Sequence, residues 1–125
     1  MTRRLISTGS PMEHQAGYSR AVIKNDFAHV AGTTGYDYHT MTMPEDVRAQ
    51  TRNCLSTIAQ TLTEGGFDIA DTVRVTYYVT NVDFVPAVFE EVGRVFRDIR
   101  PAATMIICDL VDPAMLIEIE LTAQR

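Results

Sequence analysis

Apolar and small side chains recur with the period of an α-helix in two stretches of the chain. In the first stretch the recurring positions are Val47, Thr51, Cys54, Leu55, Ile58 and Leu62. Ahead of them, Thr42 offers an N-cap hydroxyl and is followed by Pro44 and a capping-box Glu45. We therefore expect a helix that begins at Thr42 and stops at Gly65-Gly66.

The second helical stretch is more apolar. The side chains that share one face of it are Phe84, Val88, Val92, Val95 and Phe96. This helix is expected to begin near Asp83 and to end at Arg100-Pro101, because proline cannot continue the ladder of helical hydrogen bonds.

Alternation of apolar and polar residues with a period of two predicts the strands. It is sharpest in residues 72–80, where Val73, Val75, Tyr77 and Val79 alternate with Arg74, Thr76 and Tyr78. The other expected strands span residues 2–7, 18–24, 27–33, 104–110 and 115–123. Asn25-Asp26 is a two-residue hairpin turn between the second and third strands, and Asp112-Pro113 is a turn between the last two.

These elements run in the order strands, helix, strand, helix, strands. Strand–helix–strand crossovers are right-handed, so both helices land on the same side of the sheet. The sequence predicts an α+β fold, a mixed six-stranded sheet with two helices packed on one face. With 125 residues, 46% of them hydrophobic and 22% charged, residues 1–125 fit one globular domain rather than a disordered chain or a fibre.

The last expected strand has two different faces. Met115, Ile117, Ile119 and Leu121 point one way, towards the helices, while Leu116, Glu118 and Glu120 point the other way. The second set shares its face with Arg74, Thr76 and Tyr78. This face is too apolar for free solvent and too polar for a core, so we expect it to be a subunit interface.

Charge and hydropathy narrow the classes of partner. Sixteen acidic residues against eleven basic ones give a net charge of −5, and the arginines are scattered, which argues against a nucleic-acid partner. The chain has no apolar run of about 18 residues and no secretory pattern after Met1, so we expect no membrane association and a cytoplasmic location. Cys54 and Cys108 lack metal-site or redox spacing, and we expect reduced, buried thiols.

No motif for a metal, a phosphate or a nucleophilic hydrolase stands out. His14, His29 and His39 have no ligand spacing, and no metal site is expected. Residues 32–35, Gly-Thr-Thr-Gly, lack the lysine and the helix start of a phosphate loop. Ser7, Ser10 and Ser19 have no recognisable base partner.

Four short motifs, in order along nearly the whole chain, carry a resemblance to a known family. They are Gly17-Tyr-Ser-Arg-Ala-Val, Val30-Ala-Gly-Thr, Arg100-Pro-Ala-Ala-Thr and Ile117-Glu-Ile-Glu. Together they resemble the RidA (YjgF) family. The resemblance implies a chorismate-mutase-like fold that forms a homotrimer, with the sheets facing inward and clefts between adjacent subunits.

The resemblance also implies a reaction. The best-known members of the family hydrolyse reactive 2-imino or 2-enamino acids to 2-oxo acids and ammonia without metal or organic cofactor. By register with the family pattern, Tyr18 lines the cleft, the backbone at Gly32 and Thr33 contacts the substrate, and Glu118 positions the attacking water. From the residues alone, Glu118 could equally form an interface ion pair, with one of the two glutamates paired to Arg74 or another arginine, and Tyr18 could be a packing residue.

One family feature is missing. The family pairs an arginine with the substrate carboxylate, and the matching position here is Ala103, whose methyl group cannot make that pair. Arg20 is a candidate replacement if the strand already runs there, since it would then share a face with Tyr18; the alternative is a solvated or glutamate-paired arginine. We expect a cofactor-free hydrolase of a small imine or enamine, or else a non-catalytic trimer that binds a metabolite or a partner protein in the same clefts.

Overall fold

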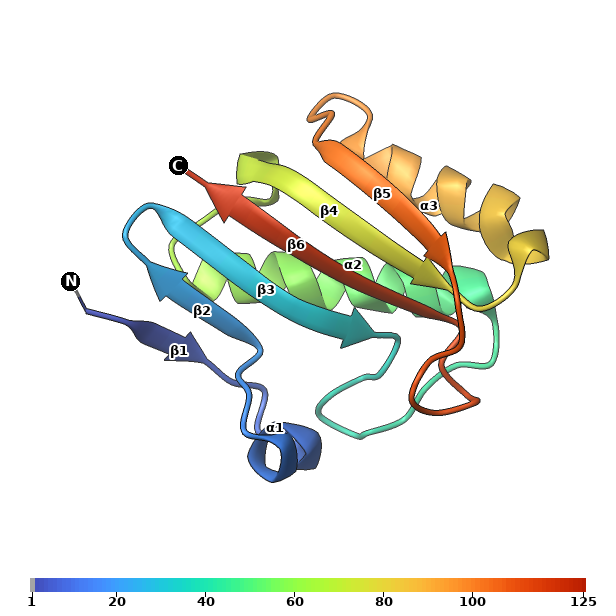
Figure 1. Ribbon diagram of the computed structural model, residues 1–125, viewed down its shortest axis with the longest axis horizontal. Coiled ribbons are helices and arrows are strands. Elements are labelled where there is room, and N and C mark those ends of the chain that lie inside the picture. Colours follow the sequence, from blue (N-terminus) through green and yellow to red (C-terminus); the bar gives the residue numbers. More distant parts are fainter. Residues whose placement is uncertain (1) are drawn as a thin grey trace.

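The structure, a computed structural model that describes residues 2–125, has one sheet with two long helices behind it (Figure 1). Six strands follow the spatial order β1-β2-β3-β6-β4-β5. Their bounds are β1 Arg4–Ile6, β2 Ala21–Lys24, β3 Phe27–Thr34, β4 Thr72–Val79, β5 Ala102–Ile107 and β6 Ile117–Gln124. The mixed six-stranded sheet predicted from the sequence is confirmed, including the hairpin at Asn25-Asp26.

The strand pairing explains why the sheet is mixed. β4 and β5 are parallel, and β6 is antiparallel to both of its neighbours, β3 and β4. A parallel pair needs a long crossover, which the second long helix supplies. The fifth strand begins two residues before the expected residue 104 and ends three residues before residue 110. The sixth begins two residues after residue 115, because the Met115 N–H donates to the Asp112 carbonyl in a turn.

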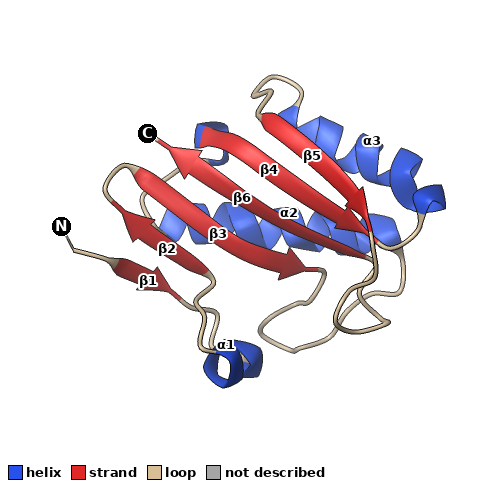
Figure 2. Cartoon of the chain, viewed as in Figure 1, coloured by secondary structure: helices blue, strands red, loops and turns tan. Residues whose placement is uncertain are grey.

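Helices α2, Val47–Glu64, and α3, Val85–Phe96, both cover the same face of the sheet, as predicted (Figure 2). Two short 3₁₀ turns, η1 Ile69–Asp71 and η2 Val82–Phe84, precede β4 and α3. Among residues 2–125, no helix has both the length and the apolar character needed to cross a membrane.

The expected start of α2 was wrong. Its N-cap is Asp46, whose side chain accepts a hydrogen bond from the Ala49 N–H at 2.9 Å. Thr42 instead forms an isolated bridge with Asp37, whose N–H donates to the Thr42 carbonyl at 2.8 Å. Thr42, which the local pattern assigned to the start of the helix, therefore belongs to the turn at residues 37–42.

A short helix, α1 Pro11–Ala16, occupies what the sequence indicated was a loop. It has a proline at its start and Gly17 at its end, where φ is +74° and the N–H donates to the Glu13 carbonyl at 3.0 Å. Proline at the first turn and left-handed glycine just past the last are helix-end signals. The glycine and proline were therefore helix boundaries rather than loop residues.

The core lies between the sheet and the two long helices. β6 contributes Ile117, Ile119 and Leu121 to it, all at most 4% exposed, and α2 contributes Cys54, Ile58 and Leu62. The opposite, open face of the sheet carries Glu118 and Glu120. Because neighbouring side chains on a strand alternate between faces, the prediction is confirmed for Ile117 to Leu121. It was wrong for Leu116, which precedes the strand and packs against the core.

Gln50 connects two loops, the one before α2 and the one before β6. It is fully buried on α2, its amide nitrogen donates to the carbonyls of Pro44 at 2.7 Å and Ala114 at 2.9 Å, and its amide oxygen accepts from the Leu116 N–H at 2.9 Å. The backbone of the segment that leads into β6 is thus fixed by one side chain. Gly35 packs so closely on Gln50 that a Cβ there would lie 2.6 Å away.

Replacing Gln50 by leucine should leave those three backbone groups without partners. We expect Gln50→Leu to lower the free energy of unfolding by roughly 2–4 kcal/mol, measured by urea denaturation. Gln60→Leu is the matched control: Gln60 is exposed on the same helix, and its substitution should change stability by less than about 0.5 kcal/mol. Equal effects of the two substitutions would contradict the assignment.

Candidate functional site

Glu118 lies on the open face of β6, beside β3 on one side and β4 on the other. Its register partners are Thr34 on β3 and Tyr78 on β4. The side chain is half-buried, and within residues 2–125 its carboxylate has no hydrogen-bond or ion-pair partner. A half-buried carboxylate without a partner has its oxygens available for a ligand or a water molecule.

Gly32 makes the room for this carboxylate. A Cβ on Gly32 would lie 1.9 Å from Glu118 Oε2 and 2.9 Å from the carboxyl carbon. Between Val30 and Thr33 the register of β3 against β6 slips, so two residues of β3 oppose one of β6. The absent side chain at this bulge lets the carboxylate lie directly against the backbone of β3.

Arg20, which directly precedes β2, stabilises this bulge through its side chain. Only 1% of it is exposed, and its guanidinium donates to the Gly32 carbonyl at 2.7 Å and to the Tyr38 hydroxyl at 2.9 Å. Its central carbon lies 5.3 Å from the centre of the Tyr38 ring and 5.7 Å from that of Tyr18. The Arg20 Nε is buried without a partner in the described residues.

The structure changes the interpretation of Arg20. It is neither solvated nor ion-paired to a glutamate, as one sequence alternative had it. These two hydrogen bonds use one N–H of each terminal nitrogen, so three of the five N–H donors of the guanidinium, the buried Nε among them, have no acceptor in residues 2–125. In the single chain, the contact of Arg20 with the Gly32 carbonyl fixes the backbone on which Glu118 rests.

Tyr18 reaches the same cluster although it is not in a strand. β2 begins only at Ala21, so the condition under which Tyr18 and Arg20 would share a strand face does not hold. The Tyr18 N–H instead donates to the Glu13 carbonyl at the end of α1. Its ring is 37% exposed and stands at the edge of the cluster, where it can line a cleft.

The side chain of Thr33 does not face Glu118. The bulge reverses the alternation along β3, so Thr33 lies opposite Ile119 on the helix side, fully buried, and its hydroxyl donates to the Ala31 carbonyl at 2.9 Å. Any contact of Thr33 with a ligand on the open face would have to come from its backbone. Thr34 is the residue in register with Glu118. Strict alternation of side chains along β3 does not predict this position for Thr34.

Within the described residues of the single chain, neither Glu118 nor Glu120 forms an ion pair with Arg74. Glu120 accepts a hydrogen bond from the Tyr78 hydroxyl at 2.6 Å, and Arg74 donates to the Thr104 hydroxyl at 3.2 Å. Tyrosine and threonine hydroxyls on neighbouring strands are nearer than the opposite charges. Of the two glutamates on β6, Glu118 is the one left without a partner in the described part of the chain.

Ala103 lies on the other side of the sheet from Glu118. It pairs with Val75 on β4, a core residue on the helix side, and it lines a groove between α3 and β5. The single chain therefore brings together Glu118, Gly32, Arg20 and Tyr18, and it leaves Ala103 apart.

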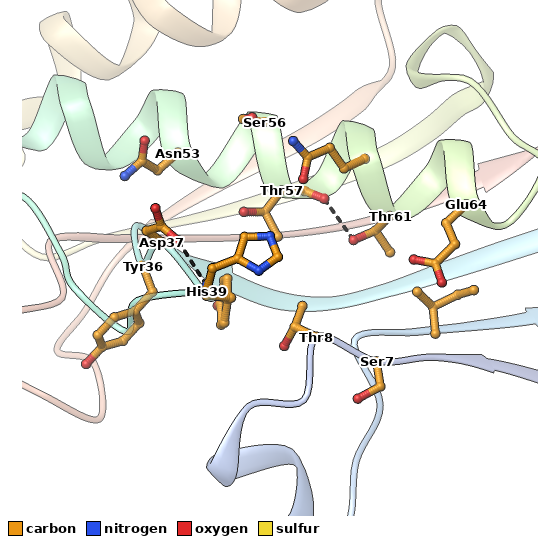
Figure 3. Close-up of a pocket in the computed structure, with 13 residues that line it drawn as sticks. Ser7, Thr8, Tyr36, Asp37, His39, Asn53, Ser56, Thr57, Thr61 and Glu64 are labelled. Atoms are coloured by element: carbon orange, nitrogen blue, oxygen red, sulfur yellow. Dashed lines mark hydrogen bonds between the residues drawn. The ribbon is translucent and has the colours of Figure 1, made fainter.

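A second, polar pocket of about 340 Å³ lies between the end of β1, the loop after β3 and the side of α2 (Figure 3). Residues of α2 that line it are Asn53, Ser56, Thr57, Gln60, Thr61 and Glu64. His39 and Asp37 face them from the loop (Figure 3). We did not predict this pocket from the sequence, although the polar residues at steps of three and four along α2 could have indicated it.

Electrostatics distinguish Glu118 from an ordinary surface carboxylate. Burial raises the pKa of Glu118 above its ordinary value of 4.5, the positive charge of Arg20 partly opposes the shift, and Glu120 adds to it. A carboxylate whose pKa is raised is a stronger base than a solvated one and accepts a proton from water more readily. Among residues 2–125, no cluster of three histidine, cysteine, aspartate or glutamate side chains could hold a metal ion.

Comparison with known proteins gives consistent matches over nearly the whole chain. A family model described as Endoribonuclease L-PSP matches residues 8–125. The chain is 38% identical to a Mycobacterium tuberculosis member of the YjgF/YER057c/UK114 family, with a TM-score of 0.91 over 99% of this chain and 100% of the other. It is 28% identical to a proposed endoribonuclease from Thermotoga maritima, with a TM-score of 0.90 over 100% and 98% of the two chains. It is also 28% identical to an uncharacterized Streptomyces coelicolor protein, over 98% of this chain and 92% of that protein.

The contact between Gly32 and Glu118 can be tested by filling the missing side chain. Gly32→Ala should lower the free energy of unfolding by about 1–3 kcal/mol, because the new Cβ overlaps the carboxylate. In the double variant Gly32→Ala/Glu118→Ala most of the loss should disappear, which a double-mutant cycle measures. Gly93→Ala is the control: its Cβ meets only Arg97 at 3.4 Å, and this variant should gain up to roughly 1 kcal/mol. Additive effects at Gly32 and Glu118 would contradict the contact.

The raised pKa of Glu118 predicts a pH dependence of stability. Folded protein binds this proton more tightly than the unfolded chain, so the wild type should lose stability relative to Glu118→Gln as pH rises from the ordinary value of 4.5 through the raised value. Below that window the difference should be constant. Urea denaturation at fixed protein concentration, from about pH 4 to about pH 8, measures it. A difference that is flat, or that favours the wild type at higher pH, would show that the pKa is not raised.

Proposed function

Since the chain belongs to the RidA (YjgF) family, whose model carries the description Endoribonuclease L-PSP, we propose that it hydrolyses small reactive imines or enamines without a cofactor. The observation that carries this proposal is Glu118: a half-buried carboxylate, without a partner in the described residues, with a raised pKa, and resting on the backbone of Gly32. Such a group holds and deprotonates water in a restricted space and needs no metal to do so.

The chemistry proceeds in two steps. Glu118 accepts a proton as the water oxygen bonds to the carbon of the C=N group, and the nitrogen takes up a proton from solvent to give a carbinolamine. Glu118 then gives its proton to the departing nitrogen, the C–N bond breaks, and the hydroxyl group loses its proton to solvent as the C=O bond of the product forms. The products are a carbonyl compound and ammonia, and Glu118 returns to its carboxylate form. An enamine enters the same route after protonation at carbon.

We also propose that the protein acts as a homotrimer with its sites between subunits. The open face of the sheet carries exposed apolar residues such as Leu5, 57% exposed, and Ile106, 42% exposed, and no helix formed by residues 2–125 covers this face (Figure 1). A mixed apolar and polar face of this kind favours an interface. Because Glu118 and Ala103 lie on opposite sides of one sheet, a cleft that contains both positions needs two chains.

The alternative is a non-catalytic trimer that binds a small metabolite or a partner protein in the same clefts. Ala103 favours it, because the family pattern has the carboxylate-binding arginine at this position. Ribonuclease activity, which the name of the family model suggests, is less well supported: the net charge is −5, and a polyanion would be repelled on average.

The proposal is tested by supplying 2-aminoacrylate or 2-iminobutyrate from a dehydratase and following the release of ammonia and 2-oxo acid. The wild type should accelerate release, and Glu118→Gln should lower that acceleration by about a hundredfold or more, because the amide cannot accept the water's proton. No acceleration with several imines, neutral and charged, would favour the binding alternative.

Two controls keep the interpretation of this assay clear. Glu120→Gln makes the same change two residues away, at a side chain already bonded to Tyr78, and should retain most of the activity. Light scattering should give about three times 13.9 kDa for every variant compared. A stable monomer at micromolar concentration would refute the trimer and with it the cleft between subunits.

A further inference from the structure

The polar pocket beside α2 is separate from the cluster around Glu118 (Figure 3). We call it the α2 pocket. Ile6, which lines it, belongs to the core on the helix side of the sheet, so the pocket lies away from the face that we propose as the subunit interface. Its volume of about 340 Å³ is at the lower end of the range for small-molecule sites, roughly 300–1,000 Å³. The pocket therefore has room for one small ligand.

One side of the pocket is a row of polar side chains on α2 that the chain itself does not use. Ser56, Gln60 and Glu64 follow one another at steps of four residues, and none of them has a side-chain hydrogen bond or an ion pair to residues 2–125. The Ser56 hydroxyl and the Gln60 amide can both donate and accept hydrogen bonds, and Glu64 supplies acceptor oxygens. These groups are available to a ligand.

The other sides of the pocket are held in place by hydrogen bonds within the chain. Asp37 Oδ1 accepts from two backbone N–H groups of its loop, that of His39 at 2.9 Å among them, which leaves Oδ2 free to accept. The hydroxyls of Ser7 and Thr8 both donate to the buried Glu13 carboxylate. Groups that are already oriented lose less conformational freedom when a ligand binds.

The charges of the pocket disfavour an anion. Asp37 and Glu64 line it, and among the described residues no lysine or arginine does so. A ligand that is only a cation fits poorly as well, because it donates hydrogen bonds and would leave the donors of Ser56, Gln60 and His39 without acceptors. Donors and acceptors that alternate along the lining match ligand groups that both donate and accept, and hydroxyl groups do so.

We propose that the α2 pocket binds a neutral monosaccharide. The inference goes beyond the proposed function and does not depend on it. The carboxylates of Asp37 and Glu64 accept hydrogen bonds from sugar hydroxyls, and the Gln60 amide donates to a sugar oxygen. The His39 ring projects from the loop into the pocket, towards α2 (Figure 3). Because the face of an aromatic ring is partly negative, this ring can pack against the C–H groups of the sugar.

The test is an NMR titration of the wild-type protein with D-glucose, D-galactose and D-ribose. We expect at least one of these sugars to give saturable shifts in the backbone signals of residues that line the α2 pocket. Cyclohexanol supplies a ring with one hydroxyl group, glucose 6-phosphate adds a doubly charged anion, and putrescine supplies two amines without hydroxyls. Each of the three should bind more weakly than the sugar.

Substitutions on α2 test whether the pocket is the site. Gln60→Ala/Glu64→Ala should weaken sugar binding by about tenfold or more, because each hydrogen bond contributes a factor of about three to ten. Both side chains are exposed and alanine favours a helix, so this variant should fold, which circular dichroism checks. Thr63→Ala, at an exposed position of the same helix outside the pocket, is the control and should change nothing. Tyr38 is kept, because its hydroxyl accepts from Arg20 beside the Glu118 cluster.

The proposal is overturned if none of the three sugars gives saturable shifts at the pocket, or if the wild type and Gln60→Ala/Glu64→Ala bind the sugar equally. Tighter binding of putrescine than of any sugar would show a site for organic cations instead. Glucose 6-phosphate binding more tightly than glucose would contradict the argument from charge. Imine hydrolysis does not enter the measurement, so its presence or absence leaves this result unaffected.

Discussion

A guanidinium that is buried to 1% exposure must find hydrogen-bond acceptors inside the protein, because a charge without partners is costly to remove from water. Arg20 finds them in the Gly32 carbonyl and the Tyr38 hydroxyl. These two contacts fix the bulge of β3 and the loop that follows it. The bulge in turn decides which side chains of β3 face the open side of the sheet, and the bare backbone at Gly32 admits the Glu118 carboxylate.

The two faces of the sheet carry different functional groups. The open face holds a carboxylate with a raised pKa and no partner in the described residues, next to the buried guanidinium of Arg20, which donates to the Gly32 carbonyl and the Tyr38 hydroxyl. The helix side holds a groove between α3 and β5 that contains Ala103. Because Glu118 and Ala103 lie on opposite faces of one chain, a cleft that contains both positions needs a second subunit, so assembly is part of the proposed mechanism.

Local sequence patterns predicted most elements, and their failures have identifiable causes. The period of α3 placed its start within two residues, and the hairpin at Asn25-Asp26 is where the turn signal put it. The N-cap of α2 was misplaced because Thr42 is used by a bridge to Asp37, and α1 was missed because its proline and glycine were interpreted as loop residues. In each case the residue type fits two local structures, and contacts outside the local segment choose between them.

The sequence by itself determined the sheet with two helices on one face and the outward position of Glu118, because residue identity and hydrophobic period are local properties. Only the tertiary structure decided that Arg20 is buried, that Thr33 faces the core and that Ala103 shares a groove with Arg97 and Arg100. A single bulge reverses the alternation of a strand, and a buried charge depends on acceptors distant in the sequence. Neither the bulge in β3 nor the burial of Arg20 can be predicted from the residues of one segment alone.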